Sequence, residues 1–259
     1  MRSLTLMIIC LLLSKGLSAA VPYDHIHLAA TDAREAVDWY VKHLGGTPGS
    51  FNRGDAGRVE YPVDRVFYNE LSVIFFERES TGGSVGTGVD HIGFSMTGVE
   101  EVTAAMVADG ATQLGEFVEF SGMTIAFVED PWGTKLELID DPETRGLHHL
   151  HLSSPEPTET LNWYQQNFGG DIVQWKGALP AINYSDVWLI VARANGEIAP
   201  TQGTSMDHLG WAAENLDELG DIFASNGVEF TMAPRPFRGI RISFIEGPDG
   251  VRIEVVEPD

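Results

Sequence analysis

The stretch VPYDHIHLAATDAREAVDWYVKHLGG (residues 21–46) contains the repeating unit of this chain. It recurs as GLHHLHLSSPEPTETLNWYQQNFGG (residues 146–170), with a His-x-His strand, an amphipathic helix and a Gly-Gly exit in both copies. Units that repeat in this way bury a shared core that no single unit could bury alone. The repetition therefore predicts a fold assembled from similar strand-helix units.

Shorter motifs reveal two further units. VDHIGFS (residues 89–95) is similar to MDHLGWA (residues 206–212), and each leads into another helix. DPWGTKLELID (residues 130–140) is similar to GPDGVRIEVVE (residues 247–257), and a Pro-x-Gly turn precedes the last strand in both. The chain thus follows the order strand, helix, strand, strand, strand four times. This order predicts an α+β fold of four βαβββ units.

The ends of the first helix can be read from the sequence. Asp32 is a predicted N-cap, and Glu35 stands at the capping-box position three residues later. Gly45 suits the left-handed backbone that commonly ends a helix. We therefore expect a helix over residues 33–44.

Acidic residues dominate the composition, with 38 Asp and Glu against 16 Lys and Arg and a formal net charge of −22. Nucleic acids and anionic membrane surfaces attract basic patches, so this charge argues against both as partners. The hydrophobic fraction of 43% is that of a globular protein with a core. A small molecule is therefore the expected partner, and the sequence leaves a homodimer open.

The first twenty residues (1–20) have the features of a secretory signal peptide. Arg2 supplies the positive charge, residues 4–13 form an apolar run, and small residues precede a cleavage site near Ala20. This run is too short to cross a bilayer, and no later segment is apolar enough to do so. The sequence therefore predicts export to the periplasm or the medium. The mature chain would keep no cysteine, because Cys10 lies inside the signal.

Histidines mark the starts of the four units, where seven of the eight in the chain lie. Residues two apart on a strand share a face, so ligand-type side chains are expected on the sheet face that the helices leave open. They form two sets: His25, His91 and Glu137 in the first half, and His149, His208 and Glu254 in the second. Two imidazoles and one carboxylate leave coordination positions open and suit Fe²⁺, with Mn²⁺ or Zn²⁺ as alternatives.

The units, with DHIHLAATDAREAVDWYVKHLGG, VDHIGF and DPWGTKLEL, resemble the vicinal oxygen chelate superfamily. That group includes glyoxalase I, type I extradiol dioxygenases and the bleomycin-resistance proteins. The resemblance covers residues 22–257. It implies the glyoxalase/bleomycin resistance/dihydroxybiphenyl dioxygenase fold, in which units pair into cup-shaped mixed-sheet modules with a divalent metal inside. It also implies that the two sets of side chains are metal ligands.

On this resemblance, residues 22–140 form the first module, residues 141–146 a linker and residues 147–257 the second module. The four-unit chain looks most like the extradiol dioxygenases, which keep their metal in the second module. We therefore expect the second module to carry the working site.

Five further residues are predicted to lie beside the metal or the substrate. His27 and His151 neighbour the ligands on their strands, and Phe244 precedes the last turn. Arg238 and Arg241 belong to the segment APRPFRGIR, whose charges could steer a carboxylate or phenolate to the second cup.

The chain departs from the extradiol pattern at two positions. Extradiol enzymes carry a tyrosine where this chain has Phe244, and a middle-strand histidine that is absent between His151 and His208. Glu77 is a candidate fourth ligand of the glyoxalase kind in the first module. No catalytic residue is assigned.

The predicted function is that of an exported, divalent-metal-dependent enzyme on a small oxygen-chelating substrate. Ring-cleaving dioxygenase chemistry is favoured, because three protein ligands leave room for both substrate and oxygen. A glyoxalase-like lyase or isomerase is one alternative. A non-catalytic small-molecule binding or resistance protein is the other.

Overall fold

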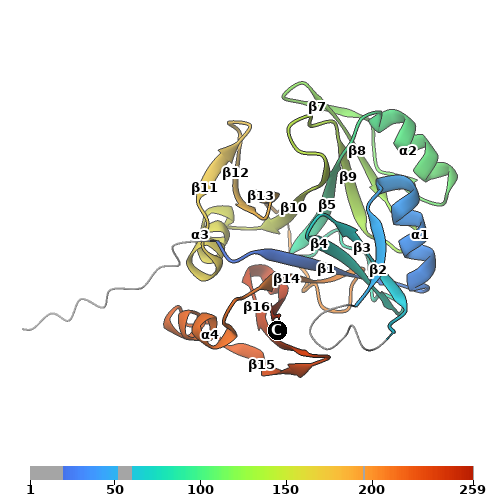
Figure 1. Cartoon of the computed structure of the whole chain (residues 1–259). Coiled ribbons are helices and arrows are strands. Elements are labelled where there is room, and N and C mark those ends of the chain that lie inside the picture. The colour runs from blue at the N-terminus through green and yellow to red at the C-terminus, as the bar shows by residue number, and fades with distance from the viewer. Residues whose placement is uncertain (1–19, 52–59, 195, 259) are drawn as a thin grey trace, which may run out of the picture.

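The computed structural model describes residues 20–51, 60–194 and 196–258 (Figure 1). Residues 1–19 of the predicted signal peptide, with Cys10, lie outside the described residues. Among the helices that are described, none is long and apolar enough to span a membrane.

Four units follow one another, as the repeats predict. The first contains β1 (Tyr23–Ala30), α1 (Ala33–Leu44), β2 (Thr47–Ser50), β3 (Val63–Tyr68) and β4 (Leu71–Glu77). The second contains β5 (Val89–Ser95), α2 (Val99–Ala108), β6 (Thr112–Gln113), β7 (Val118–Phe120), β8 (Met123–Glu129) and β9 (Lys135–Ile139). The third contains β10 (Gly146–Ser154), α3 (Pro157–Phe168), β11 (Ile172–Trp175), β12 (Leu179–Tyr184) and β13 (Val187–Arg193). The fourth contains β14 (Met206–Ala212), α4 (Leu216–Ser225), β15 (Phe230–Phe237), β16 (Ile240–Glu246), the 3₁₀ turn η2 (Pro248–Gly250) and β17 (Arg252–Glu257).

Two cup-shaped sheets carry the strands, and each takes strands from both halves of the chain. Within the described residues, one sheet has eight strands in the order β15-β16-β17-β14-β1-β4-β3-β2. The other has nine, in the order β11-β12-β13-β10-β5-β9-β8-β6 with β7 on β8. Antiparallel pairing of unit-opening strands, β1 with β14 and β5 with β10, joins the units. The first unit therefore shares a sheet with the fourth, and the second with the third.

This pairing corrects the module composition predicted from the sequence, which built one sheet within residues 22–140 and the other within residues 147–257. The connection from β9 to β10 has only six residues (140–145), and both strands flank β5, so the second and third units stay in one sheet. Longer connections run from β4 to β5 (residues 78–88) and from β13 to β14, and these cross between the sheets.

One hydrophobic core lies between the two sheets and includes the buried faces of all four helices. Tyr40 of α1 packs against Phe75 of one sheet and Phe94 of the other, with ring centres 4.9 and 6.4 Å apart. The fully buried Trp211 stacks on Phe168 of α3 at 4.6 Å. The opposite faces of the sheets point away from this core and form the two cups.

The helices pair within each half, unlike the strands (Figure 1). Between α1 and α2, the indole N–H of Trp39 donates to the backbone oxygen of Asp109 (3.0 Å), and Lys42 pairs with its carboxylate (2.6 Å). Between α3 and α4, Asn226 donates to the side chain of Asn167 (3.2 Å). Strand pairing therefore joins units across the two halves, whereas helix pairing joins the two units within each half.

The first helix begins and ends as predicted. The Asp32 side chain accepts a hydrogen bond from the backbone N–H of Glu35 (2.9 Å). Gly45 follows the helix with a φ of 72°, and its N–H donates to the carbonyl of Val41. Residues 33–44 form α1.

Asp130 is buried where α1 packs against the turn before β9. Its carboxylate accepts hydrogen bonds from the Tyr40 hydroxyl (2.7 Å) and from the N–H groups of Trp132 (2.9 Å) and Thr134 (2.8 Å). Burial raises the pKa of Asp130 to about 6, although these donors act in the opposite direction. The folded state therefore binds this proton more tightly than the unfolded chain does. Stability is lost as the pH rises from about 4 to about 6.

We expect Asp130→Asn to remove this loss, because the amide keeps an acceptor for the turn and carries no charge. Relative to the wild type, the free energy of unfolding of the variant should rise by about 2 kcal/mol between pH 4.5 and pH 7. Urea denaturation at the two pH values measures the difference. Asp140→Asn, at a partly exposed aspartate that pairs with Arg145 on the surface, is the control. Parallel pH profiles for the wild type and Asp130→Asn would contradict this account.

Candidate functional site

Four potential metal ligands meet at the floor of cup A, the open face of the eight-stranded sheet. His25 and His27 come from β1, His208 from β14 and Glu254 from β17, and one donor atom of each lies within 4.8 Å of the others. Oε2 of Glu254 lies 3.1 Å from Nε2 of His25 and 3.0 Å from Nε2 of His208. Strand register brings them together, because His27 lies directly opposite His208 in the β1–β14 pairing.

A glycine makes room for the first ligand of each cup. Gly210 lies opposite His25, and a Cβ at Gly210 would come within 2.2 Å of that imidazole. Gly93 has the same place opposite His149 in the other sheet, where the distance would be 2.1 Å. The glycine two residues after His91 and the one two residues after His208 therefore let the neighbouring strand's imidazole lie across them.

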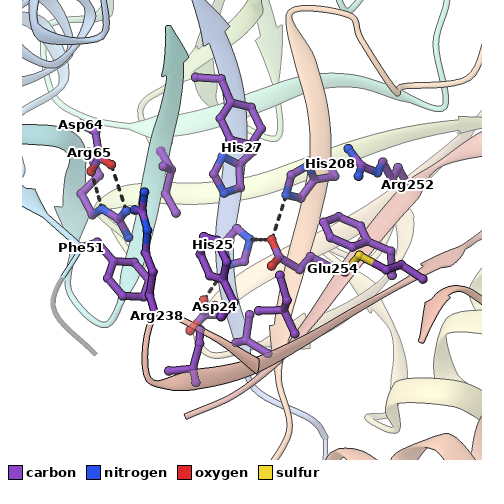
Figure 2. A pocket seen from close by; sticks show the side chains of 18 of the residues that line it. Asp24, His25, His27, Phe51, Asp64, Arg65, His208, Arg238, Arg252 and Glu254 are labelled. Carbon is purple, nitrogen blue, oxygen red and sulfur yellow. Dashed lines mark hydrogen bonds and ion pairs between the residues drawn. The ribbon is translucent and has the colours of Figure 1, made fainter. Parts of the chain in front are cut away.

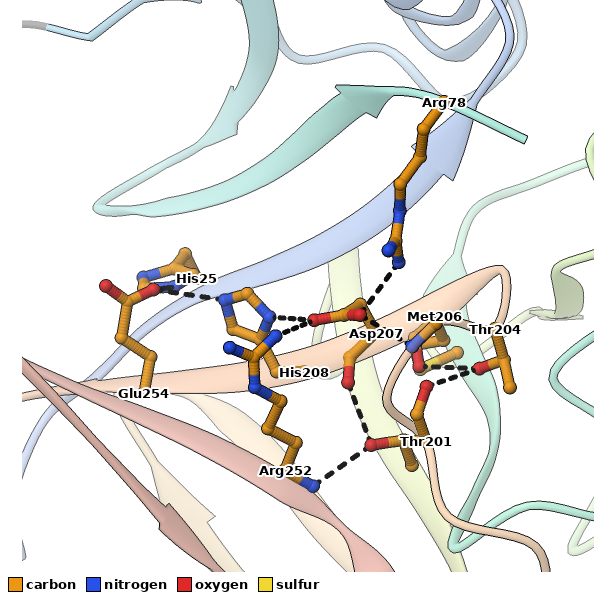
Figure 3. Close-up of polar contacts among 10 residues, drawn as sticks. His25, Arg78, Thr201, Thr204, Met206, Asp207, His208, Arg252 and Glu254 are labelled. Carbon is orange, nitrogen blue, oxygen red and sulfur yellow. Dashed lines mark hydrogen bonds and ion pairs between the residues drawn. The ribbon is translucent and has the colours of Figure 1, made fainter. Parts of the chain in front are cut away.

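Carboxylates hold the outer ring nitrogens of two ligands in cup A. Asp24 Oδ2 lies 2.6 Å from Nδ1 of His25 (Figure 2). Asp207 Oδ1 lies 2.5 Å from Nδ1 of His208 (Figure 3). A carboxylate that accepts the Nδ1 proton fixes the ring and leaves Nε2 as the donor of a lone pair. Both Nε2 atoms accordingly point toward Glu254.

The carboxylate of Asp207 is in turn fixed by two arginines and a backbone N–H group. Arg78 and Arg252 each donate to its carboxylate at 2.7 Å, and the Gly203 N–H donates at 2.7 Å. Burial alone would raise the pKa of Asp207, but the hydrogen bond from His208 and these partners keep it well below its usual range. The group is therefore a charged, fixed support for the imidazole.

His27 is the third imidazole of cup A. Its ring stacks on Phe76 at 4.1 Å between centres, and its centre lies 4.3 Å from that of His208. Nδ1 of His27 is buried and has no hydrogen-bond partner among the described residues. Burial lowers the pKa of His27 well below its usual value, and the charges of His208 and His25 add to the effect. The neutral ring can donate a lone pair to a metal or accept a proton.

This donor set fits a divalent metal. Nitrogen and oxygen donors bound to one ion at about 2.1 Å lie roughly 3.0–3.4 Å apart, and the distances from Glu254 to His25 and His208 agree with that range. Neutral imidazoles with one carboxylate are accepted by Zn²⁺, Mn²⁺ and Fe²⁺. His25, His208 and Glu254 can hold such an ion, with His27 as a fourth donor.

A cavity of about 410 Å³ adjoins this cluster (Figure 2). Its volume falls in the range of small-ligand sites. Its wall combines aromatic rings with cations: Phe76, Phe244, Arg65, Arg235, Arg238 and Arg252. Arg65 is paired with Asp64, which also lines the cavity, and Arg252 with Asp207, each at 2.7 Å. Arg235 and Arg238 form no ion pair among the described residues, so the wall suits a small ligand that has an apolar body and a negative charge.

Arg238 stands at the tip of the β15–β16 hairpin. Its φ of 48° and the φ of 81° at Gly239 are those of a type I′ turn, whose first position favours Asn, Asp or Gly. The guanidinium lies 4.7 Å from the ring centre of Tyr61 and 5.1 Å from that of Phe237. Within the described part of the chain it forms no ion pair. An arginine therefore occupies a strained position with its charge directed to the cavity wall.

Cup B, the open face of the nine-stranded sheet, holds a second cluster. His91 of β5, Glu137 of β9, and His149 and His151 of β10 have donor atoms within 4.8 Å of one another. Glu137 Oε2 lies 3.0 Å from His91 Nε2 and 3.5 Å from His149 Nε2. The same residue types thus recur at the same places in the repeat.

The structure groups the predicted ligands differently from the sequence analysis. The sets are His25 with His208 and Glu254, and His149 with His91 and Glu137. Each set combines both halves of the chain, because each sheet does. His27 and His151 lie within ligand distance in their cups. Glu77 belongs to neither cluster, because Phe76 takes the cup-facing position near the end of β4.

Of the residues predicted to line the substrate site, some line the cavity of cup A and one does not. Phe244 and Arg238 line the cavity of cup A. Arg241 does not, and this prediction is wrong. Its guanidinium donates to Asp217 of α4 and to Glu257, because this position of β16 points toward the helices.

Sequence reasoning missed the residues that orient the ligands. An aspartate precedes the ligand histidine at three unit starts, as Asp24, Asp90 and Asp207. Neighbours on a strand point to opposite faces, so alternation alone does not place these aspartates beside the ligands. In the structure each carboxylate nonetheless lies 2.5–2.6 Å from the Nδ1 of the next residue. Arg65, which comes from β3, had no signal in the sequence.

Solved structures of other proteins have the same fold. The crystal structure of glyoxalase I from Zea mays superposes with a TM-score of 0.68 at 17% identity, covering 91% of this chain and 92% of that chain. A putative dioxygenase from Bacillus subtilis subsp. subtilis str. 168 gives 0.63 at 14% identity, covering 92% and 85%. At these identities the likeness concerns the fold. A search of curated proteins found no significant sequence match.

A family model gives the sequence evidence. The model described as Glyoxalase/Bleomycin resistance protein/Dioxygenase superfamily matches residues 23–138 and 146–255, which together make up most of the chain. The matches and the fold agree, and the chain belongs to this superfamily.

Proposed function

We propose that this chain is a divalent-metal-dependent enzyme whose working site is cup A. One observation carries the proposal. Three imidazoles and a carboxylate converge on one point at the edge of a cavity whose wall contains four arginines. The substrate would be a small anion that binds through two adjacent oxygens.

The metal would be held by His25, His208 and Glu254, with His27 as the fourth ligand. Bound there, a divalent ion supplies a Lewis acid that stabilises negative charge on the substrate oxygens. Asp24 and Asp207 keep the ring nitrogens of His25 and His208 in the ligating tautomer.

Glu254 has a second oxygen available for chemistry. Oε2 makes its contacts with the imidazoles, whereas Oε1 makes no hydrogen bond among the described residues. Burial would raise the pKa of Glu254, but the hydrogen bonds from His208 and His25 hold it well below its usual range. The carboxylate is therefore ionised at neutral pH, and Oε1 can accept a proton from the substrate.

The class of reaction depends on whether His27 binds the metal. With His27 as a ligand, the protein would supply four donors, and a six-coordinate ion would keep two positions for a chelating substrate. This arrangement favours a lyase or isomerase that works by proton transfer. The ring spacing between His27 and His208 supports ligation, because two imidazoles bound at right angles to one ion have centres roughly 4.5 Å apart.

Ring cleavage with oxygen is the second candidate, and it is the function favoured by the sequence. It requires His27 to stay off the metal, which would leave a third position for O₂. The neutral, unpartnered His27 would then be free to act as the base that the missing tyrosine and middle-strand histidine do not supply. A non-catalytic binding protein remains the alternative from a different class.

The proposal includes export, because residues 1–20 have the sequence features of a signal peptide. An exported protein works in an oxidising compartment, where Fe²⁺ is hard to keep reduced. Zn²⁺ or Mn²⁺ is therefore the favoured metal, and homodimer formation stays a prediction.

The ligand assignment is tested by metal titration of the mature chain. His208→Ala should lower the bound Zn²⁺ or Mn²⁺ by one equivalent relative to the wild type, because it removes a ligand of cup A. Asp207→Asn should weaken that binding by about 10–100-fold, because it removes the support of His208. Asp217→Asn, at an exposed aspartate outside the cup, is the control. Unchanged stoichiometry and affinity in His208→Ala would refute the assignment.

The class of reaction is tested on the metal-loaded wild type. Deuterium incorporation from D₂O into α-hydroxycarbonyl acids, followed by NMR, reports proton transfer. Oxygen uptake with catechols reports ring cleavage. Proton transfer without oxygen uptake is the expected result. Oxygen uptake would favour the dioxygenase, and turnover of neither class with metal bound would favour the binding protein.

The arginines that line the cavity of cup A predict that ligands with a carboxylate bind more tightly than ligands without one. Protocatechuate and catechol both chelate metals through adjacent oxygens, but only protocatechuate has a carboxylate. The Zn²⁺-loaded protein should bind protocatechuate more tightly, and Arg238→Asn should reduce that preference by about 10-fold or more. Asn suits the first position of a type I′ turn, so the hairpin should be retained. Ser121→Asn changes the matching hairpin position of cup B and should have no effect. If Arg238→Asn and the wild type showed the same preference, Arg238 would have no part in binding the carboxylate.

A further inference from the structure

We propose that Arg252, the first residue of β17, is a positioning residue for His208 and holds that imidazole from two sides. This role rests on the proposed function, because it concerns a ligand of cup A, and the proposed function gives Arg252 a place only in the cavity wall. The main evidence is a closed ring of contacts among four side chains, which recurs in cup B.

Arg252 bonds to the carboxylate oxygen that holds His208. Oδ1 of Asp207 lies 2.5 Å from Nδ1 of His208, and Nη1 of Arg252 donates to the same oxygen at 2.7 Å (Figure 3). Arg78 donates instead to the other oxygen, Oδ2, which also accepts the N–H of Gly203. A charge-assisted hydrogen bond to Oδ1 fixes the oxygen that receives the imidazole proton. Arg252 therefore acts on His208 more directly than Arg78 does.

The guanidinium also lies on an aromatic ring that touches the same imidazole. Cζ of Arg252 stands 4.0 Å from the ring centre of Phe244, which is within the range of a cation–π contact. Phe244 in turn meets His208 edge to face, at 5.1 Å between ring centres and 78° between planes. The carboxylate limits movement of the imidazole within its plane, and the phenyl ring limits rotation out of that plane. One cation thus joins both restraints.

The strand register explains how one residue reaches both partners. Arg252 comes two residues before the ligand Glu254 on β17 and therefore shares its face. Phe244 of β16 lies directly opposite Glu254, so Arg252 is its diagonal neighbour. The backbone N–H of Arg252 donates to Oγ1 of Thr201 (3.0 Å), whose hydroxyl donates to the backbone oxygen of Asp207 (2.8 Å). The start of β17 is therefore tied to the aspartate that the side chain contacts.

The same ring of contacts recurs in cup B with a lysine as the cation. Lys135, two residues before Glu137, donates to Oδ1 of Asp90 at 2.5 Å, and this oxygen lies 2.6 Å from Nδ1 of His91. Nζ of Lys135 lies 4.6 Å from the ring centre of Phe127, which meets His91 edge to face at 5.4 Å and 77°. A cation two residues before the glutamate is therefore part of the repeated unit and is not particular to cup A.

The second cation on Asp207 is not repeated. The backbone N–H of Arg78 donates to the carbonyl of Ala30, and the N–H of Ala194 donates to the carbonyl of Ser154 at the same distance of 2.8 Å. Ala194 therefore occupies the place in the third unit that Arg78 has in the first. The repeat keeps the cation that corresponds to Arg252 and replaces the other by alanine, which makes Arg78→Ala a matched control.

Two other roles for Arg252 predict different effects on metal binding. If Arg252 acted through its charge alone, its removal would strengthen the binding of a divalent cation, because like charges repel. If it only received a substrate anion, its removal would leave metal affinity unchanged. A positioning residue predicts weaker metal binding, so the sign of the change separates the three roles.

The first test is Zn²⁺ affinity, measured by competition with a chromophoric chelator. All chains carry His91→Gln, which removes a donor from cup B, so that the change is assigned to cup A. Arg252→Met keeps an unbranched stem without the charge and should weaken Zn²⁺ binding by about 10–100-fold. Arg252→Lys introduces the cation of cup B and should recover most of the affinity. Arg78→Ala should cost less than Arg252→Met.

The second test uses the metal-free chain without the His91 substitution. The Nδ1–H proton that His208 donates to Asp207 is buried, so it should exchange slowly with water and give a downfield NMR signal that His208→Gln removes. Arg252→Met should broaden or abolish this signal, and Arg252→Lys should retain it. Lys135→Met should have the same effect on the corresponding signal of His91.

Four results overturn the proposal: unchanged or tighter Zn²⁺ binding in Arg252→Met, no recovery in Arg252→Lys, a larger loss in Arg78→Ala, or an unchanged His208 signal in Arg252→Met. If Arg252→Met does not fold, Phe244→Leu removes the ring between the cation and the imidazole and should also weaken Zn²⁺ binding; unchanged affinity there overturns the proposal. A wild type that binds no Zn²⁺ would refute the proposed function, whereas the NMR signals would still decide the role of Arg252.

Discussion

Both cups depend on the register between the opening strands of paired units. In cup A this register sets His27 opposite His208, and the same relation recurs in cup B. Side chains alternate along a strand, so a slip of one residue would turn the histidines of β1 into the core. Ile26 and Leu28, which are fully buried on the other face, oppose such a slip. The apolar core therefore positions the polar cluster, and the glycine opposite each first ligand only makes room for it.

The same scaffold supports two different environments around similar donors. A chain with a net charge of −22 repels anions at long range, but salt limits the reach of that field to about 8 Å. Arginines that line a cavity act within this distance, so cup A can attract an anion despite the acidic surface. Ala181 and Val118 occupy the positions of cup B that match Arg65 and Arg235, and Lys135 lies there over the ring of Phe127. The two cups therefore differ in side chains that face them, while the strand pairing around the ligands is the same.

The sequence predicted the fold and the face on which each candidate ligand lies, because both follow from periodicity. The repeats gave four units, and alternation placed His25, His208 and Glu254 on the open face. It could not predict which units pair, because every opening strand has the same pattern and can pair with any other. Arg241 was misplaced for a similar reason, since its local segment does not reveal which face of β16 meets α4. The role of Arg65 depends on tertiary contacts that no local pattern encodes.

Strands that pair across the halves, with helices that pair within them, give the chain the architecture of a two-fold dimer fused into one polypeptide. In a symmetric dimer of two-unit chains, every substitution would enter both cups at once. A histidine lost from one site would be lost from both, and an arginine gained in one would be gained in both. Fusion through the six residues between β9 and β10 removes this coupling. The residues around one cup can then change while those around the other are kept.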